Sequence, residues 1–386
     1  MPKQYGRPPA SWISVWLHWR ACQIKDPVTR LGYLRRYAPL SPVRLVLTPA
    51  RAAILTAVVT VSIVLYWPAI TSASKPATAP RDLRGQARKM KSVPSAGAKQ
   101  QIWIVEQKNG YEIYSNGLRI EAAGAATHTH RRYIPLPRHK PEAWRQEPAP
   151  NTPRRTAPAG IVYHTTESEL FPFQPSSNRA IQFAGTKLLE YVRNRKSYHY
   201  LIDRFGRVHR VVEEDRVANH AGWSVWADRD WVYVNLNDSF LGVAFEAQTQ
   251  PQNGEDAVNP AQVYAGRILT EMLRARYDIP AENCTTHGQV SVNPDNMKIG
   301  NHTDLGAGFP YAEFGLPDNY RIPPPSMLLF GFAYDSVYWD RIEPELRLSL
   351  QAGEKQLQNQ ALRRPDLQRR FRDYIAIWRR QQDNGI

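Results

Sequence analysis

Two histidines and an aspartate lie within one short polar stretch of the sequence. His287 stands in Thr-His-Gly-Gln, and Asp304 follows His302 by two residues in Asn-His-Thr-Asp. A further histidine, His164, ends a short apolar run about 120 residues upstream. Two imidazoles and one carboxylate, with one position left open, suit a catalytic Zn²⁺, which lowers the pKa of a bound water and polarises a carbonyl group. His164, His287 and Asp304 are therefore candidate zinc ligands.

Glu246 is the one charged residue in the apolar run Leu241–Ala247. A carboxylate is rarely buried without a partner or a task. Burial raises the pKa of a carboxyl group, which suits a general base that works near neutral pH. Alternation along a strand also allows Glu246 to face solvent, so the sequence pattern alone leaves both interpretations open.

Strands and helices alternate around these residues. Residues 160–166 read as a strand that ends near His164, and 198–212 and 241–247 read as a hairpin and a buried strand. Ser176-Ser177-Asn178 can cap a helix through about Arg195, and Asn259-Pro260 begins a second helix through Tyr277, with proline at its first position. Both predicted helices carry an apolar stripe. This alternation predicts an α/β fold with a mixed central β-sheet flanked by helices, over residues 159–320.

Five segments of this domain, in order, resemble the zinc-dependent N-acetylmuramoyl-L-alanine amidases, a family that includes phage lysozyme-type amidases and peptidoglycan recognition proteins. The resemblance covers about 40% of the chain. The segments are Ile161–Glu167, Ser197–Val208, Ala218–Gly222, Leu241–Glu246, and Thr286–Gln289 leading to His302–Gly306.

The resemblance implies a groove for a glycan–peptide strand, with peptidoglycan or muropeptides as substrate. It implies Zn²⁺ held by His164, His287 and Asp304, and cleavage of the amide between N-acetylmuramic acid and L-alanine. Glu246 matches the base of members that have one, and Tyr198 matches a tyrosine that assists catalysis. His220 matches a groove histidine, and we also expect substrate contacts from its neighbour Asn219 and from His199.

The sequence departs from the family pattern at two positions. The family usually has lysine two residues before the third ligand, where it stabilises the oxyanion, and this chain has His302 there. A protonated His302 could serve the same role, and His302 is also a rival third ligand. Where the family has Asp-Pro-Gly, this chain has Asp304-Leu305-Gly306. The loop from His287 to Asp304 is also longer than in the compact members of the family.

The N-terminal part of the chain predicts a single-pass membrane anchor. Residues 52–70 are 19 residues without a charge, which is about the length that spans a bilayer. Residues 1–51 carry nine Lys or Arg and one acidic residue, so this segment is expected to be cytoplasmic. A buried core helix and, less well, a cleaved signal peptide are the alternatives. Residues 71–100 read as a linker.

Three further segments complete the organisation. Residues 101–125 predict a small β element, because two Asn-Gly pairs separate short apolar runs. Residues 126–158 are rich in proline and read as a linker or a surface strap. Residues 321–386 predict a C-terminal helical extension with an Arg-rich face, either packed on the domain with that face solvated or in contact with anionic lipid.

Composition limits the function classes. A net charge of +15 favours polyanions, including an anionic cell wall, but the basic residues cluster at the membrane flank and the tail, which does not favour nucleic acid. Cys22 and Cys284 flank the anchor, so no disulfide is expected. We expect a bacterial inner-membrane protein with its catalytic domain in the periplasm. A peptidoglycan-binding module without catalysis and a lytic effector are the rival functions.

Overall fold

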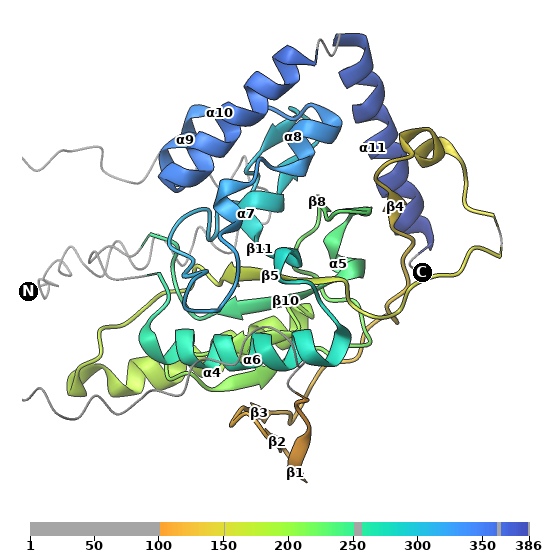
Figure 1. Cartoon of the computed structure of the whole chain (residues 1–386). Coiled ribbons are helices and arrows are strands. Elements are labelled where there is room, and N and C mark those ends of the chain that lie inside the picture. Colours follow the sequence, from red (N-terminus) through yellow and green to blue (C-terminus); the bar gives the residue numbers. More distant parts are fainter. Residues whose placement is uncertain (1–100, 150, 251–256, 361–363, 385–386) are drawn as a thin grey trace, which may run out of the picture. The chain divides into compact units, whose positions relative to one another are not determined.

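The structure, a computed structural model, describes residues 101–149, 151–250, 257–360 and 364–384 (Figure 1). The predicted basic segment 1–51, the membrane anchor 52–70 and the linker 71–100 lie outside the described residues. Among the helices that are described, none is long and apolar enough to cross a membrane.

A mixed sheet of eight strands forms the centre of the domain, as the sequence predicts. Strands β6, β10, β5 and β11 run parallel to one another, and β6 pairs with β7 antiparallel as the predicted hairpin. In spatial order the strands are β1 (Ile104–Lys108), β2 (Tyr111–Tyr114), β3 (Arg119–Glu121), β7 (Val208–Arg210), β6 (Tyr200–Ile202), β10 (Phe240–Phe245), β5 (Gly160–Thr165) and β11 (Cys284–Thr286).

The small N-terminal β element is part of this sheet. Strands β1 to β3 form an antiparallel meander, and its two turns contain the Asn-Gly pairs, with φ of +102° at Gly110 and +86° at Gly117. Strand β3 pairs in parallel with β7. The 101–125 segment therefore extends the main sheet at one edge.

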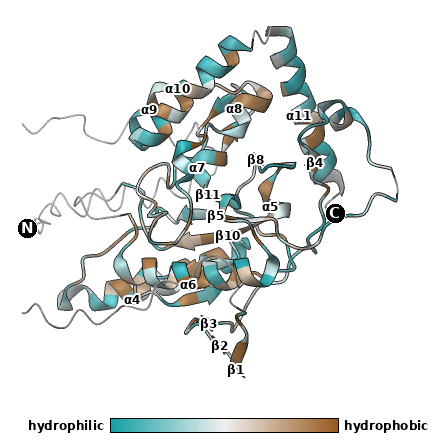
Figure 2. Ribbon diagram, in the orientation of Figure 1, coloured by the Kyte–Doolittle hydropathy of each residue, from teal (hydrophilic) through white to brown (hydrophobic). Residues whose placement is uncertain are grey.

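Alternation along the central strands sends side chains to two different cores. Ile161 and Tyr163 of β5 pack in one cluster with apolar residues of helix α6 (Pro260–Tyr277), whereas Val162 packs with residues of a second, small sheet. Helix α4 (Asn178–Arg195) contributes Val192 to a third cluster. Each of these helices has hydrophobic and hydrophilic positions (Figure 2), as a helix that covers a sheet requires.

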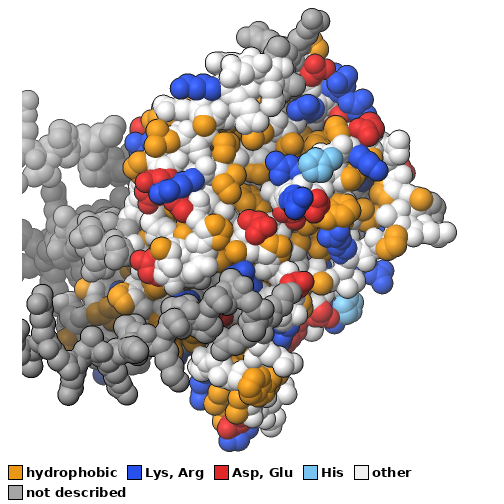
Figure 3. Space-filling view, viewed as in Figure 1, with side chains coloured by type: hydrophobic (Ala, Val, Ile, Leu, Met, Phe, Trp, Pro, Cys, Tyr) orange, Lys and Arg blue, Asp and Glu red, His pale blue; other side chains and the backbone are white. Residues whose placement is uncertain are grey.

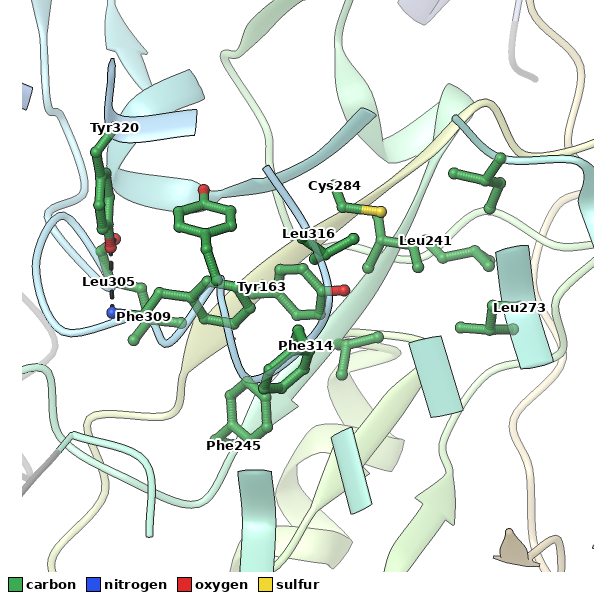
Figure 4. Packing of buried hydrophobic residues seen from close by; sticks show 14 of the residues in the cluster. Tyr163, Leu241, Phe245, Leu273, Cys284, Leu305, Phe309, Phe314, Leu316 and Tyr320 are labelled. Atoms are coloured by element: carbon green, nitrogen blue, oxygen red, sulfur yellow. Dashed lines mark hydrogen bonds between the residues drawn. The ribbon is translucent and has the colours of Figure 1, made fainter. Parts of the chain in front are cut away.

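An aromatic cluster around Tyr163 (Figure 4) anchors β5. Tyr163 is the residue before the predicted ligand His164. The Tyr163 ring stacks on Phe309 at 4.4 Å between ring centroids and meets Phe314 edge-on at 5.5 Å. Such pairs contribute about 0.5–1.5 kcal/mol each beyond the area that they bury. The strand that carries His164 is thus fixed from the opposite face of the sheet.

The proline-rich segment 126–158 is a strap on the domain surface. Its strand β4 (Leu136–Pro137) pairs with β9 (Trp231–Val234), which also pairs with β8 (Val225–Ala227) to form the second sheet. Trp144, in the 3₁₀ helix η1 (Pro141–Arg145), is buried. The segment is therefore packed on the domain over much of its described length.

The C-terminal extension consists of helices that pack together beside the sheet (Figure 1). They are α8 (Pro325–Phe330), α9 (Ser336–Arg341), α10 (Pro344–Asn359) and α11 (Arg364–Asn384). In α11, Tyr374 and Ile377 are buried while Arg372 and Arg379 are exposed. This agrees with the prediction of a helix packed on the domain with a solvated Arg face.

The remaining elements are short. They are α5 (Leu236–Ser239), α7 (His287–Val290), β12 (Val292–Asn293), β13 (Lys298–Ile299) and the 3₁₀ helices η2 (Pro175–Ser177), η3 (Ala281–Asn283) and η4 (Asn319–Arg321). On the face shown in Figure 3, Lys and Arg side chains are interspersed with Asp and Glu rather than gathered in one basic patch.

Candidate metal centre

Two neighbouring parallel strands bring the first two predicted ligands together. Strand β11 pairs with β5 so that Thr286 lies opposite Tyr163. The residue that follows each of this pair is a predicted ligand: His164 lies within β5, and His287 follows the end of β11 as the first residue of α7 (His287–Val290). Both therefore lie at the carboxyl edge of the sheet. Ligand sites of α/β sheets commonly lie at this edge.

Asp304 completes the cluster from the long loop that follows α7. Its carboxylate lies 3.1 Å from Nδ1 of His164 and 2.8 Å from Nδ1 of His287. One ligand atom from each of the three residues lies within 4.8 Å of the others. In the described residues this is the group of His, Cys, Asp and Glu side chains that could hold a metal ion.

The protonation of the cluster suits a divalent cation. Burial and the neighbouring His287 lower the pKa of His164 to about 4, so this imidazole is neutral near pH 7. The neighbouring His287 holds the pKa of Asp304 well below its usual range, against the effect of burial. A neutral imidazole and an ionised carboxylate are the forms that bind metal.

A hydrogen-bond chain fixes the tautomer of His164. Nε2 of His220 lies 3.3 Å from the carbonyl oxygen of Phe240, to which it donates. Nδ1 of His220 then accepts from Nε2 of His164, at 3.2 Å. Nδ1 of His164, which faces Asp304, is left with a free lone pair. Metal-binding histidines commonly have such a partner on the second ring nitrogen.

The C-terminal extension holds the loop that carries Asp304. The Tyr338 hydroxyl donates to the Gly288 carbonyl at 2.8 Å, and the Glu343 amide donates to the Gly306 carbonyl at 3.0 Å. The Gly288 amide of α7 donates to the Asp304 carbonyl of the loop at 2.9 Å. The two ligand-bearing segments are therefore tied to each other and to α9 and α10.

A pocket of about 280 Å³ opens over the cluster. Tyr198, His220 and His302 line it, as do the three candidate ligands. Its other lining residues are Thr165, Thr166, Glu167, Ala221 and Gly222.

Tyr198 is placed to donate a hydrogen bond into this pocket. Its ring centroid is 5.0 Å from that of His164. Burial, followed by the charge of Asp304, raises its pKa, so the phenol keeps its proton. Its φ of +63° is unusual for an aromatic residue, and such outliers are found mostly where the surrounding structure enforces them at functional sites.

His302 lies beside the cluster without belonging to it. Its ring stacks on that of His287, with the centroids 4.7 Å apart and the planes inclined by 19°. Burial and His287 lower the pKa of His302, which disfavours the protonated imidazole considered from the sequence. The third member of the cluster with two imidazoles is Asp304, rather than the rival His302.

Glu246 is buried, and its surroundings separate it from the pocket. It is 4% exposed, and burial raises its pKa, as expected for a desolvated carboxyl group. Its Oε2 accepts the Arg204 amide at 3.2 Å, and Gly185 of α4 lies close above it. Glu246 is not one of the described residues that line the pocket.

Two of the predicted substrate-binding residues also lie away from this pocket. His199 is fully buried, with Nδ1 accepting the Gly242 amide at 2.9 Å and Nε2 donating to the Arg216 carbonyl at 3.0 Å. Asn219 is exposed and donates to the Arg195 carbonyl at 3.0 Å. The geometry gives these two side chains structural contacts, and their contact with substrate stays a prediction.

Two residues at the site were not singled out from the sequence. Glu167 lines the pocket three residues after His164. Oδ1 of Asn237 accepts the backbone amides of His220, Ala221 and Gly222 and so shapes one wall. Glu167 could have been identified from the sequence, because it is a polar residue shortly after the strand that carries His164. Asn237 is far from the candidate ligands in the sequence, and no sequence signal points to it.

Comparison with known proteins identifies the domain that contains this centre. The family model described as N-acetylmuramoyl-L-alanine amidase matches residues 154–307. No curated protein matches the chain.

Several solved structures are similar. The N-acetylmuramyl-L-alanine amidase AmiD from E. coli is 20% identical, with 56% of this chain and 93% of AmiD covered and a TM-score of 0.33. The amidase LysC from Clostridium intestinale is 22% identical, covering 41% and 83%, with a TM-score of 0.26. The Drosophila peptidoglycan recognition protein SD is 14% identical, covering 45% and 85%, with a TM-score of 0.27.

Proposed function

Because residues 154–307 form a domain of the N-acetylmuramoyl-L-alanine amidase family, we propose that this protein is a zinc-dependent peptidoglycan hydrolase. It cleaves the amide between the lactyl group of N-acetylmuramic acid and the L-alanine of the stem peptide, for remodelling or turnover of the cell wall. The observation that carries the proposal is the cluster of His164, His287 and Asp304 at the floor of a pocket. AmiD, one of the similar structures, was solved with a muramic acid–peptide substrate.

His164, His287 and Asp304 would hold the zinc, since two imidazoles and a carboxylate leave one position open. Zinc bound there supplies polarisation of the scissile carbonyl and activation of water. Tyr198 donates its phenolic proton in a hydrogen bond to a substrate oxygen. A neutral His302 can also donate a hydrogen bond from the pocket wall to the oxygen on which charge develops.

The sequence predicts Glu246 as the group that takes the proton of the attacking water. Its raised pKa supports this role. Its position beneath α4, away from the pocket, counts against it.

Purified full-length protein loaded with zinc is expected to release stem peptides with a free L-alanine amino group from peptidoglycan or muropeptides. A chelator should lower the rate by at least about 100-fold, because the metal contributes several kcal/mol to stabilising the transition state. Labelling of new amino groups, with mass spectrometry of the products, measures this release.

The same assay distinguishes the proposed hydrolysis from the rival function, which is peptidoglycan binding without catalysis. A binding module would retain peptidoglycan in a pull-down while releasing no peptide at any zinc concentration, and this outcome would contradict the proposed hydrolysis. Restoration of the rate by added zinc, but not by added magnesium, controls for damage by the chelator.

We also propose that residues 52–70 anchor the protein in the bacterial inner membrane, with the catalytic domain in the periplasm, because this uncharged run follows a basic segment. The full chain is expected to stay in the membrane fraction after an alkaline carbonate wash. A variant with two leucines of the run, Leu55 and Leu65, changed to arginine should become extractable. Extraction of the unaltered chain would refute the anchor.

A further inference from the structure

A second carboxylate, Glu167, faces the same pocket as the candidate metal ligands. It belongs to the loop that leaves β5 three residues after His164, and it lines the pocket together with His164 and Asp304. Its side chain is exposed, so a water or a substrate group can reach it. Glu246 lies on the same face of the sheet but beneath α4. Position therefore favours Glu167 for contact with the reacting atoms.

A directed chain of hydrogen bonds orients the Glu167 carboxylate. The Leu305 amide donates to Oγ1 of Thr249 at 2.9 Å, which leaves the Thr249 hydroxyl to donate to Oγ1 of Thr165 at 2.8 Å. The Thr165 hydroxyl then donates to Oε1 of Glu167.

The Thr249 amide donates to the same oxygen at 2.9 Å. Every bond in the chain points toward Oε1, so the carboxyl group serves as an acceptor. These bonds use one oxygen and hold the plane of the carboxylate, as a preorganised reactive group requires.

The backbone fixes the position of Glu167 as well. Its amide donates to the Ala247 carbonyl at 3.0 Å, and its φ is +50°, in the left-handed region. A residue other than glycine adopts this region mostly where the surrounding structure enforces it. The chain that begins at Leu305, the neighbour of Asp304, thus joins the carboxylate to the metal-binding loop.

We propose that Glu167, rather than Glu246, is the catalytic carboxylate, and this inference rests on the proposed amidase function. As the oxygen of the attacking water bonds to the lactyl carbonyl carbon, Glu167 takes a proton from that water. As the carbon–nitrogen bond breaks, Glu167 returns the proton to the nitrogen of L-alanine. The products are a free lactyl carboxyl group and a free amino group, so atoms and charge balance.

The first test compares Glu167→Gln with Glu246→Gln and with Glu169→Gln in the zinc-loaded full chain. The amide of Glu167→Gln can still accept from Thr165 and Thr249, so its fold should be unchanged. We expect its kcat to fall by about 10²–10⁴-fold, the usual contribution of general acid–base catalysis. The kcat of the other two variants should stay within about threefold, since Glu169 is an exposed residue of the same loop outside the pocket.

Two measurements that do not depend on turnover accompany the rates. Zinc content should remain that of the wild type, and calorimetry should give the metal-free Glu167→Gln protein the same affinity for a muropeptide within about threefold, because a change below 1 kcal/mol is expected. A loss of muropeptide affinity as large as the loss in kcat/KM would mean that Glu167 only binds substrate, and it would overturn the inference.

Chemical rescue provides the second test. Formate added to Glu167→Ala should raise its rate by at least about tenfold, because an exposed site admits a small carboxylate that can act as the base. If the wild type is active and Glu167→Gln keeps the kcat of the wild type, this inference is wrong while the proposed function stands. A zinc-loaded wild type that releases no peptide would overturn the proposed function and this inference with it.

Discussion

Replacing Asp304 by alanine is expected to leave the purified protein without zinc and to lower amidase activity by at least about 10³-fold, since the metal supplies several kcal/mol of catalysis. The physical reason is the position of its carboxylate, which lies within 3.1 Å of Nδ1 in both His164 and His287. Without it, two imidazoles remain and no anion offsets the charge of the cation. Elemental analysis after dialysis measures the zinc.

His302→Ala is the matched variant for this experiment. The His302 ring stacks on His287 but lies outside the group of three ligand atoms, so its removal should leave one zinc per chain. Activity should fall by a smaller factor, about 10- to 100-fold, if His302 donates to the developing oxyanion. If His302→Ala lost zinc while Asp304→Ala retained it, His302 rather than Asp304 would be the third zinc ligand.

Much of the fold could be predicted because its signals are local. A histidine at the end of an apolar strand and a histidine in a polar loop after a helix, taken together with the resemblance to the amidase family, singled out His164 and His287 as candidate ligands. Parallel pairing of β5 with β11 then places them side by side. The Asn-Gly turns and the helix start at Asn259-Pro260 likewise lie where the sequence predicts them.

The carboxylates show where this reasoning stops. Alternation along the predicted strand 241–247 places Glu246 on one face of the sheet, directly after β10 in the structure. The pattern cannot tell whether that face meets the pocket or lies beneath α4. Only the packing of Gly185 above Glu246 decides this. Glu167 carries a weaker sequence signal, because its orientation depends on Thr249 and Leu305, which are distant along the chain.

The support of the metal loop by the C-terminal extension could not be predicted either. The sequence indicates helices after residue 321, but it gives no reason for Tyr338 to meet Gly288. The match to the family ends at residue 307, so this contact lies beyond the pattern on which the resemblance rests. In this chain the extension is part of the structure that positions the candidate metal ligand Asp304.

Gly288→Ala is the second change with a large expected effect. A methyl group at Gly288 would lie 2.7 Å from the backbone nitrogen and Cα of Gly306, and backbone atoms cannot move aside as a side chain can. Tyr338 holds Gly288 from one side, and Glu343 holds Gly306 from the other. The methyl group would therefore force apart the segments that carry His287 and Asp304.

We expect this variant to lose about 1–3 kcal/mol of unfolding free energy, as overpacked sites do, and to bind zinc at least about tenfold more weakly. Chelator competition and thermal unfolding of the metal-free protein measure the two effects separately.

Gly185→Ala is the control, because its methyl group would meet only the Glu246 carboxylate, at 3.8–3.9 Å, and alanine favours the helix by up to about 1 kcal/mol. Equal zinc affinity in both variants would mean that the spacing of the two segments does not set the metal site. A selective loss in Gly288→Ala would make the backbone contact between Gly288 and Gly306 as necessary to the centre as the side chains that bind the metal.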